Sequence, residues 1–290
     1  LISDVPLGVY LSSGIDSSTI VAIASKVSEE PIKTFTMVFG DPKDEHRDSR
    51  TIAELFETDH KEVPVEANKL LKEYPKMIWH ADMPKRNLYP YYLSRAVKKH
   101  VKVVLSGLGG DELFGGYDWK YQFAMDVENL KRSVPSNIKS TLRETSRSLV
   151  EIISKYGSLG DIELMNRLKK FYFLDSNVDL YLAISSLDEV FFNDYLKNIY
   201  GEKMPANLAP VSDIFAEYFR DENGSFVDQI LLADYSVKMV DDFLHVDDTM
   251  SMANSVESRV PFLDRELVEF AFTIPSSLKF NGNTSKYILK

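Results

Sequence analysis

Apolar and polar positions divide the first 119 residues of this chain into two kinds of segment. Short apolar runs typical of buried strands alternate with longer segments in which apolar residues recur on successive helical turns. The predicted strands are Val5–Leu11, Ile32–Phe39, His60–Val65 and Val101–Ser106, and the predicted helices are Ser18–Ser28, Arg47–Glu57, Ala67–Ala81 and Pro90–Lys99. This alternation predicts an α/β fold in which a parallel sheet carries helices on both faces.

The strand signal fades from Tyr121 onward, and the remaining pattern predicts a mainly helical C-terminal lobe. The expected helices are Ile138–Tyr156, Asp161–Leu174, Asp179–Leu187, Asp213–Arg220 and a last one from Asn283 to Lys290. One stripe predicts a single helix face, and core packing is its simplest interpretation: Phe226, Ile230, Ala233, Val237, Val240 and Leu244. We therefore expect an α/β core over residues 1–119 and a helical lobe over 120–290 that packs on it and completes its active site.

The loop after the first predicted strand is rich in small residues. Ser12, Ser13, Gly14, Ile15, Asp16, Ser17 and Ser18 lead directly into a helix. A helix N-terminus offers unpaired N–H groups, so this loop is a candidate phosphate site, and Asp16 fits there if it holds a divalent cation against the phosphate. A serine-capped helix after a strand is the alternative, and it is common in α/β proteins.

A second loop, Ser106 to Tyr117, follows the last predicted strand and holds five glycines. This density suggests that the backbone closely approaches a ligand, and Asp111 and Glu112 are candidate metal ligands. A glycine-rich turn whose acids cap the next helix is the alternative. Since ligands bind at the carboxyl ends of strands in open parallel sheets, both loops fall where a site is expected. Neither loop has the Walker phosphate-loop pattern.

Composition removes several classes of function. The chain has no cysteine, which excludes disulfides, thiolate nucleophiles and cysteine-based metal centres in this segment. A net charge of −10 argues against non-specific nucleic-acid binding. Because no apolar run is long enough to cross a bilayer and no signal peptide opens the chain, we expect a cytoplasmic protein without a membrane partner. The absence of an initial Met leads us to expect part of a longer protein.

The two loops and two later motifs together resemble one family, the glutamine-hydrolysing asparagine synthetases. Leu7–Ser18 is similar to the family's pyrophosphate loop, and Ser106–Tyr117 is similar to its second nucleotide loop. Ser251-Met252-Ala253 with the segment 256–264, and then 286–290, resemble its late signatures. The four motifs occur in the family's order and cover its synthetase domain without the N-terminal glutaminase domain.

This resemblance implies an ATP-pyrophosphatase (PP-loop) fold and a two-step reaction. A substrate carboxylate attacks the α-phosphate of ATP to give an acyl-adenylate and pyrophosphate, and ammonia then displaces AMP. The first loop would cradle pyrophosphate, Asp16 and Asp111 would hold Mg²⁺, and Lys286 would stabilise developing charge. The implied adenosine site is the main chain of Leu11, Met37, Ser106 and Gly107. Without this resemblance, Lys286 would be interpreted as an ordinary surface lysine.

Four positions depart from the family pattern. The mildest is Ser13, which adds a side chain to the first loop where the family usually has a glycine. Leu108 stands where asparagine synthetases commonly place an acid associated with forming the aspartyl-adenylate. His245 and Asp248 stand where the family often has Lys and Arg, which would weaken anion binding if that segment faces phosphate. If this segment is instead a structural helix, the two differences from the family alter only its surface charge.

The expected partners follow from this reaction. Aspartate is the default carboxylate, and ammonia would come from an N-terminal glutaminase domain. A second copy of the chain, in a homodimer, is a further candidate partner. The alternatives are the same chemistry on another carboxylate, as in β-lactam-forming or other amide-forming relatives, and a non-catalytic nucleotide-binding module.

Overall fold

The computed structural model describes residues 1–40, 46–83, 85, 87–156, 168, 176–185, 201, 210–220, 224–282 and 284–290. Their contacts divide the chain into two compact units. Unit 1 consists of Leu1–Gly116, Asp234–Pro275 and Lys286–Lys290, and unit 2 consists of Tyr117–Ala233 and Ser276–Ser285. Each unit therefore combines segments that are distant in the sequence. The expected division into residues 1–119 and 120–290 stays a prediction.

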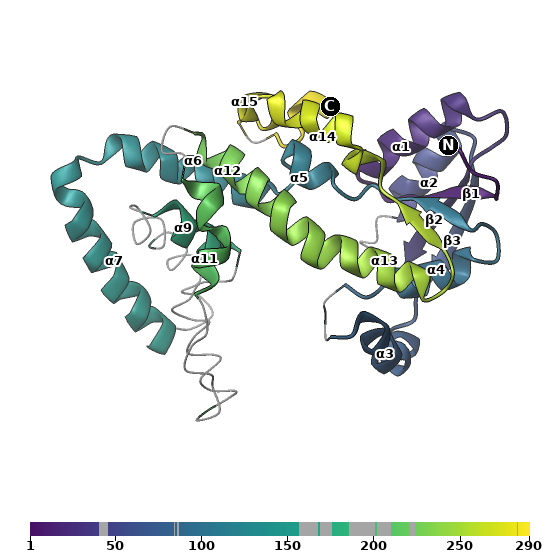
Figure 1. Cartoon of the computed structure of the whole chain (residues 1–290), viewed down its shortest axis with the longest axis horizontal. Helices are drawn as coiled ribbons and strands as arrows, with labels where there is room; N and C mark the ends of the chain where they lie inside the picture. The colour runs from purple at the N-terminus through teal and green to yellow at the C-terminus, as the bar shows by residue number, and fades with distance from the viewer. Residues whose placement is uncertain are drawn as a thin grey trace. The chain divides into compact units, whose positions relative to one another are not determined.

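A parallel sheet forms the centre of unit 1 (Figure 1). In the described residues it has five strands in the order β3-β2-β1-β4-β5. The strands are β1 (Leu7–Tyr10), β2 (Lys33–Val38), β3 (Asp59–Pro64), β4 (Val103–Leu105) and β5 (Glu257–Arg259). In the register, Val9 lies beside Leu105, which in turn lies beside Arg259. The predicted α/β fold is confirmed, with four of the five strands close to their expected positions.

Helices cover both faces of this sheet, as the pattern predicted. On one face, Val9 and Leu105 pack in one apolar core with side chains of α1 (Ile15–Val27), α2 (His46–Leu55) and α14 (Arg265–Thr273). On the other face, Phe35 and Val104 pack with α4 (Pro90–Val97). α13 (His245–Met252) lies against α4 and β5, and α3 (Ala67–Ala81) packs on α13. Because both faces of the sheet are buried, the central strands β1 and β4 are apolar runs rather than alternating patterns.

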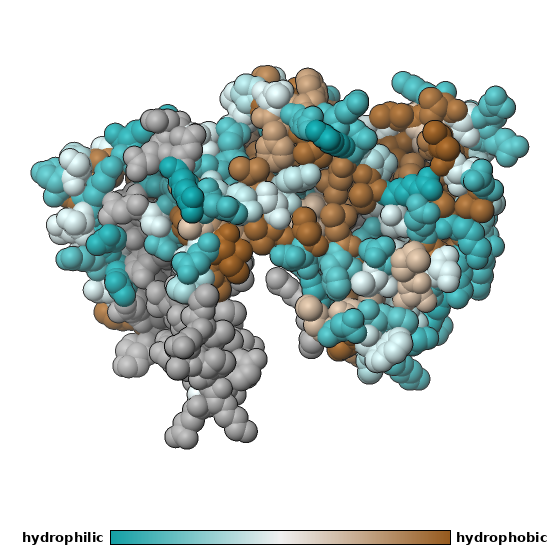
Figure 2. All heavy atoms as spheres, in the orientation of Figure 1, coloured by the Kyte–Doolittle hydropathy of each residue, from teal (hydrophilic) through white to brown (hydrophobic). Residues whose placement is uncertain are grey.

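The helix α1 is apolar on its buried and its exposed sides. Ile20, Val21 and Ala24 are buried against the sheet, whereas Ile23 and Val27 are more than half exposed. Figure 2 shows this apolar surface in the region of α1. This distribution explains why the sequence pattern there predicted a helix without a narrow amphipathic stripe.

Strand β5 was missed by the sequence analysis. Its residues Glu257, Ser258 and Arg259 carry no apolar run, and they form a strand because they hydrogen-bond in register along the edge of β4. The expected helix from Asn283 to Lys290 was wrong. In the described part of that segment, Thr284 forms an isolated bridge with Asn281, and only a short 3₁₀ turn, η6 (Tyr287–Leu289), follows.

Unit 2 is mainly helical in its described residues. Its elements are α6 (Asp118–Ser133), α7 (Ser136–Tyr156), α9 (Asn177–Ile184), α11 (Val211–Phe215), η3 (Ala216–Phe219), α12 (Phe226–Ala233) and α15 (Ser276–Lys279). The ring of Tyr181 lies 4.9 Å from that of Phe215 and 5.1 Å from that of Phe219, centroid to centroid. Aromatic packing therefore joins α9, α11 and η3. The predicted helix Asp161–Leu174 lies outside the described residues, except for Leu168.

The predicted stripe from Phe226 to Leu244 does not continue along one helix face. Phe226, Ile230 and Ala233 are buried in α12, but the chain then forms a π-helical stretch, η4 (Asp234–Leu244). There Met239 is buried and Val240 is 54% exposed. A π-helix closes its hydrogen bonds one residue further along than an α-helix, so it changes which residues share a face. No helix of the described residues is both long enough and apolar enough to cross a membrane.

Candidate active site

The two glycine- and serine-rich loops follow neighbouring strands at the same edge of the sheet. β1 pairs with β2 on one side and with β4 on the other. The strands β2 and β3 are added on one side of β1, whereas β4 and β5 are added on the other side, so the strand order switches between β1 and β4. The first loop leaves β1 and the second leaves β4, and both lie at the carboxyl ends of their strands. This arrangement is the ligand-binding position of open α/β sheets.

Hydrogen bonds inside the first loop fix its shape. The Ser17 hydroxyl lies 2.9 Å from the Ser12 hydroxyl and 3.0 Å from the Ser12 N–H, which donates to it. The Ser18 hydroxyl donates to the Gly14 carbonyl at 2.8 Å. In this structure these hydroxyls hydrogen-bond within the loop, and the predicted phosphate site stays a prediction. Gly14 is the N-cap of α1 and provides no side-chain hydrogen bond, so the first N–H groups of the helix are left uncapped.

Three glycines of the second loop lie directly against the site's own side chains. A Cβ at Gly107 would come within 2.9 Å of the Ser17 N atom. A Cβ at Gly110 would overlap the Asp16 carboxylate, and one at Gly116 would overlap the Asp111 carboxylate and approach Lys286 Cε. The backbone of this loop therefore lies close to the two acids and to the first helix, and its predicted approach to a ligand stays a prediction.

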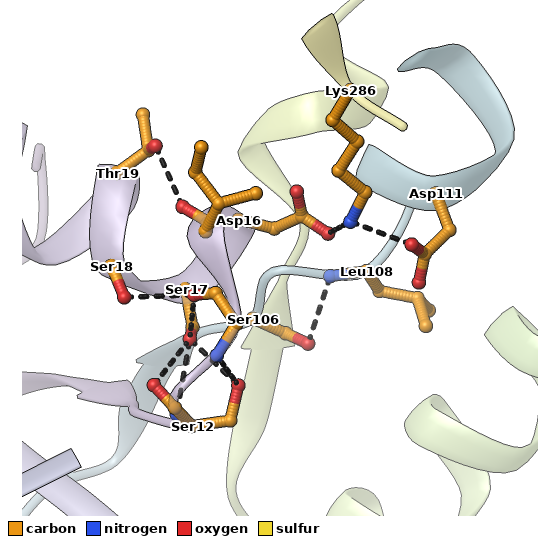
Figure 3. Close-up of polar contacts among 11 residues, drawn as sticks. Ser12, Asp16, Ser17, Ser18, Thr19, Ser106, Leu108, Asp111 and Lys286 are labelled. Carbon is orange, nitrogen blue, oxygen red and sulfur yellow. Dashed lines mark hydrogen bonds and ion pairs between the residues drawn. The ribbon is translucent and has the colours of Figure 1, made fainter. Parts of the chain in front are cut away.

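Asp16, Asp111 and Lys286 meet in unit 1 (Figure 3). The Lys286 Nζ lies 2.5 Å from Asp16 Oδ2 and 2.6 Å from Asp111 Oδ1. Asp16 stands in the first turn of α1, and Asp111 in that of α5 (Gly110–Phe114). Lys286 precedes η6 with a backbone φ of 49°, in the left-handed region. Such a conformation in a residue other than glycine is strained and is often found at functional sites.

The charges of this cluster perturb one another. Burial raises the pKa of the Asp16 carboxyl, the Lys286 ammonium partly opposes that rise, and the Asp111 carboxylate adds to it. Burial lowers the pKa of Lys286, but the Asp111 and Asp16 carboxylates outweigh it and raise the pKa overall. Lys286 is therefore charged at neutral pH. Among the described residues the buried Asp16 Oδ1 finds no hydrogen-bond partner.

The main chain expected around adenosine lies at the ends of three adjacent strands. Leu11 donates its N–H to the Phe35 carbonyl at 2.9 Å, and its carbonyl accepts from the Thr36 hydroxyl at 2.6 Å. Ser106 donates its N–H to the Arg259 carbonyl at 2.8 Å, which ties the second loop to β5. Met37 lies near the end of β2 and is half-buried. These bonds join the end of β1 to β2 and the end of β4 to β5, and because β1 pairs with β4, Leu11 and Ser106 lie at the same edge of the sheet.

Three of the residues that differ from the family pattern lie in two parts of unit 1. Leu108 lies on the loop that carries Asp111, and its N–H donates to the Ser106 hydroxyl at 3.4 Å (Figure 3). His245 and Asp248 are on α13. The His245 Nε2 lies 3.3 Å from the Ala81 carbonyl at the end of α3, and Asp248 is exposed. In this structure His245 joins two helices.

A parallel α/β sheet with two small-residue loops at its switch point, and with two acids and a lysine between them, defines a PP-loop-type synthetase domain. The comparisons with known proteins give the particular family. The family model described as asparagine synthase matches residues 1–290, and the chain belongs to that family.

Curated relatives carry both synthetase and amidase names. The chain is 31% identical to asparagine synthetase (glutamine-hydrolyzing) 1 of Bacillus subtilis over 99% of its length and 43% of that protein. It is 28% identical to amidase chry2 of Gibberella zeae over 97% of its length and 44% of that protein. It is 26% identical to asparagine synthetase (glutamine-hydrolyzing) 3 of Bacillus subtilis, covering 42% of it. The chain thus spans less than half the length of these relatives.

Proposed function

We propose that this chain is the ATP-dependent synthetase part of an amide-forming ligase. It would adenylate a carboxylate, with aspartate as the default substrate, release pyrophosphate and transfer ammonia to give the amide and AMP. Membership of the asparagine synthase family supports ATP dependence and amide formation. The observation that carries the proposal is the position of Lys286 between Asp16 and Asp111 at the switch point of the sheet.

Each side chain has a defined task in this reaction. A carboxylate oxygen attacks the α-phosphorus and pyrophosphate departs, so negative charge accumulates on the departing oxygens. The Lys286 ammonium, held charged by its two acids, offsets that charge. The uncapped N–H groups of α1 offer further stabilisation, since a helix N-terminus attracts anions. The acyl-adenylate then reacts with ammonia, and AMP leaves.

The two acids fit a magnesium ion. Asp16 Oδ1 is a buried oxygen without a hydrogen-bond partner among the described residues, so it is available to a cation. Among the described residues no group of three or more His, Cys, Asp or Glu is arranged so that it could hold a metal ion. That sparseness suits Mg²⁺, which takes one or two carboxylates together with substrate phosphates. Asp16 and Asp111 would hold the ion, which would neutralise phosphate charge.

Leu108 favours a second candidate, the same chemistry on a carboxylate other than aspartate. An apolar side chain cannot replace the acid associated with aspartyl-adenylate formation in the family. A relative named as an amidase is compatible with this alternative. A glutaminase domain as the ammonia source, a homodimer and a cytoplasmic location remain further parts of the proposal.

The deciding experiment measures pyrophosphate release from Mg-ATP with ammonium and a panel of carboxylic acids. Pyrophosphate release that depends on aspartate and is accompanied by asparagine would support aspartate as the substrate. Release with another acid would assign that acid as the substrate and would still support a ligase function. ATP binding without release for any acid would contradict the proposal and indicate a nucleotide-binding module. Asp16→Asn, with Asp118→Asn as an exposed control, tests whether the release depends on this site.

A further inference from the structure

The short helix α5, which carries Asp111, packs against the segment that follows strand β5. That segment forms the 3₁₀ turn η5 (Pro261–Leu263), and α14 begins two residues after it. Phe262 of η5 is buried, and its ring lies 6.1 Å from the ring of Phe114, the last residue of α5, centroid to centroid. α14 also contacts α5 (Figure 1). Within unit 1, η5 and α14 therefore support α5.

Leu263 of η5 contacts the backbone that leads into α5. Gly109 precedes this helix with a φ of +96°, in the left-handed region. A Cβ at Gly109 would lie 2.5 Å from Leu263 Cδ2 and 2.9 Å from Leu263 Cγ, so the leucine side chain fills the space directly over this glycine. Leu263 itself packs against the apolar core that contains Leu105 and Phe114. The loop backbone two residues before Asp111 thus lies against a side chain that the core holds in place.

α5 depends on contacts of this kind for its position. It has five residues, and a helix of this length is not stable by itself in water. The Leu113 N–H donates to the Gly109 carbonyl at 3.1 Å, so the residue that Leu263 covers also takes part in the hydrogen bonding of the helix. The start of the same loop is tied to β5, because the Ser106 N–H donates to the Arg259 carbonyl at 2.8 Å. The segment from β5 to η5 therefore holds the second loop at two points.

We propose that Leu263 is a positioning residue for Asp111. By packing on Gly109 it fixes the start of α5 and so keeps the Asp111 carboxylate 2.6 Å from Lys286 Nζ. This inference rests on the proposed function, in which Asp111 holds Mg²⁺. Residues that support a metal ligand from behind determine its orientation, and their loss weakens metal binding. Leu263 acts in this way through the loop backbone.

The first test separates positioning from general stability. Leu263→Ala and Ile274→Ala each truncate a side chain of the same apolar core, so both should lower the urea concentration at the midpoint of unfolding. Only Leu263→Ala should raise the Mg²⁺ concentration for half-maximal pyrophosphate release, by about 10–100-fold. Leu263→Met keeps the apolar volume and should leave the Mg²⁺ titration unchanged. Leu263→Val, a smaller truncation, provides the same comparison if Leu263→Ala does not fold.

Amide hydrogen exchange provides a readout that does not depend on activity. It is measured without ATP or Mg²⁺ on the N–H groups of Leu113 and Gly115, which donate to the carbonyls of Gly109 and Asp111. These amides should exchange faster in Leu263→Ala than in the unmutated chain, because the start of α5 is no longer held. The Ile274→Ala control should leave their exchange unchanged, since so short a helix exchanges through local opening and not through global unfolding.

A double-mutant cycle with Gly109→Ala tests the contact itself. In the unmutated background the new Cβ would collide with Leu263 at a positive φ, and the Mg²⁺ concentration for half-maximal release should rise. In the Leu263→Ala background the collision is removed and only the backbone strain remains. Gly109→Ala should therefore raise that concentration by a smaller factor in this background. Equal factors in the two backgrounds would contradict an action of Leu263 through Gly109.

Two further results overturn the inference. An unchanged Mg²⁺ titration in Leu263→Ala would remove the positioning role, and equal shifts in Leu263→Ala and Ile274→Ala would indicate a general loosening of the core. In both cases the unmutated chain still releases pyrophosphate, so the proposed function stands. If the unmutated chain releases none, the proposed function fails, and the role of Leu263 in the reaction fails with it.

Discussion

Lys286 and Asp16 are separated by 270 positions in the sequence, yet the Lys286 Nζ lies 2.5 Å from Asp16 Oδ2. The lysine also contacts Asp111 at 2.6 Å, so one cation holds two carboxylates from different loops. Each of these acids would repel a phosphate by itself. Together with a bound cation they can instead hold the phosphates of a nucleotide, and this is the basis of the proposed function.

Lys286→Ala should abolish most amide formation. The variant removes the cation that offsets charge on the departing pyrophosphate, and we expect a fall of about 10²–10³-fold in kcat, the range for losing one such group. Lys290→Ala, an exposed lysine four positions on, is the control and should retain activity. Equal activity in the two variants would exclude Lys286 from the chemistry.

Gly116→Ala tests the close packing around the acids. The new Cβ would overlap the Asp111 carboxylate and Lys286, so the ion pair must shift. Overpacking of this kind costs about 1–3 kcal/mol of unfolding free energy, and we expect pyrophosphate release to be lost as well. Gly282→Ala faces open space at a φ of +60°. It should lower the free energy of unfolding by about 1–2 kcal/mol through backbone strain alone and leave activity intact.

The pH dependence of stability should change in Asp16→Asn. Because the pKa of Asp16 is raised in the folded state, the folded protein binds this proton more tightly than the unfolded chain does. Its contribution to stability is therefore complete below the unfolded pKa and is lost as the pH rises through the raised folded pKa. Unfolding by urea at several acidic pH values should show the unmutated chain gaining stability relative to Asp16→Asn as the pH falls. A constant difference would contradict the raised pKa.

Asp111→Asn should weaken the use of Mg²⁺. Removing one of the two carboxylates that would hold the ion should raise the Mg²⁺ concentration for half-maximal pyrophosphate release at least about tenfold, or about 1.4 kcal/mol. Asp118→Asn, an exposed acid seven positions on, should leave the Mg²⁺ titration unchanged. Chelation of Mg²⁺ should stop pyrophosphate release in every variant, and release that persists with a chelator would contradict the metal assignment.

Leu108→Glu tests the choice of carboxylate. The substitution restores an acid on the loop that carries Asp111, where asparagine synthetases commonly have one. If Leu108 excludes aspartate, the variant should gain aspartate-dependent pyrophosphate release and lose release with the native acid. Leu108→Met, which keeps the apolar character, should retain the native preference. No change in preference with Leu108→Glu would show that this position does not select the substrate.

Local sequence patterns were enough to predict the α/β fold and the two loops. Apolar runs of strand length and helical repeats are local signals, and buried parallel strands give them clearly because both faces are covered. Loop composition also made Asp16 and Asp111 candidate site residues, since small residues allow the backbone to approach a ligand closely. The positions of β1 to β4 and of the loops that follow β1 and β4 agree with those patterns.

Features that depend on distant partners could not be read from local patterns. Glu257–Arg259 forms a strand only because β4 offers an edge, and the π-helical stretch interrupts an apparently continuous stripe. Gly110 and Gly116 must be glycine because side chains from elsewhere lie against them.

The sequence by itself determined that this chain folds as a parallel α/β sheet with nucleotide-loop motifs, because hydrophobic periodicity and loop chemistry are encoded by neighbouring residues. Only the tertiary structure decided that Lys286 lies between Asp16 and Asp111. Contacts between residues hundreds of positions apart depend on how the elements pack, and no local pattern carries that information.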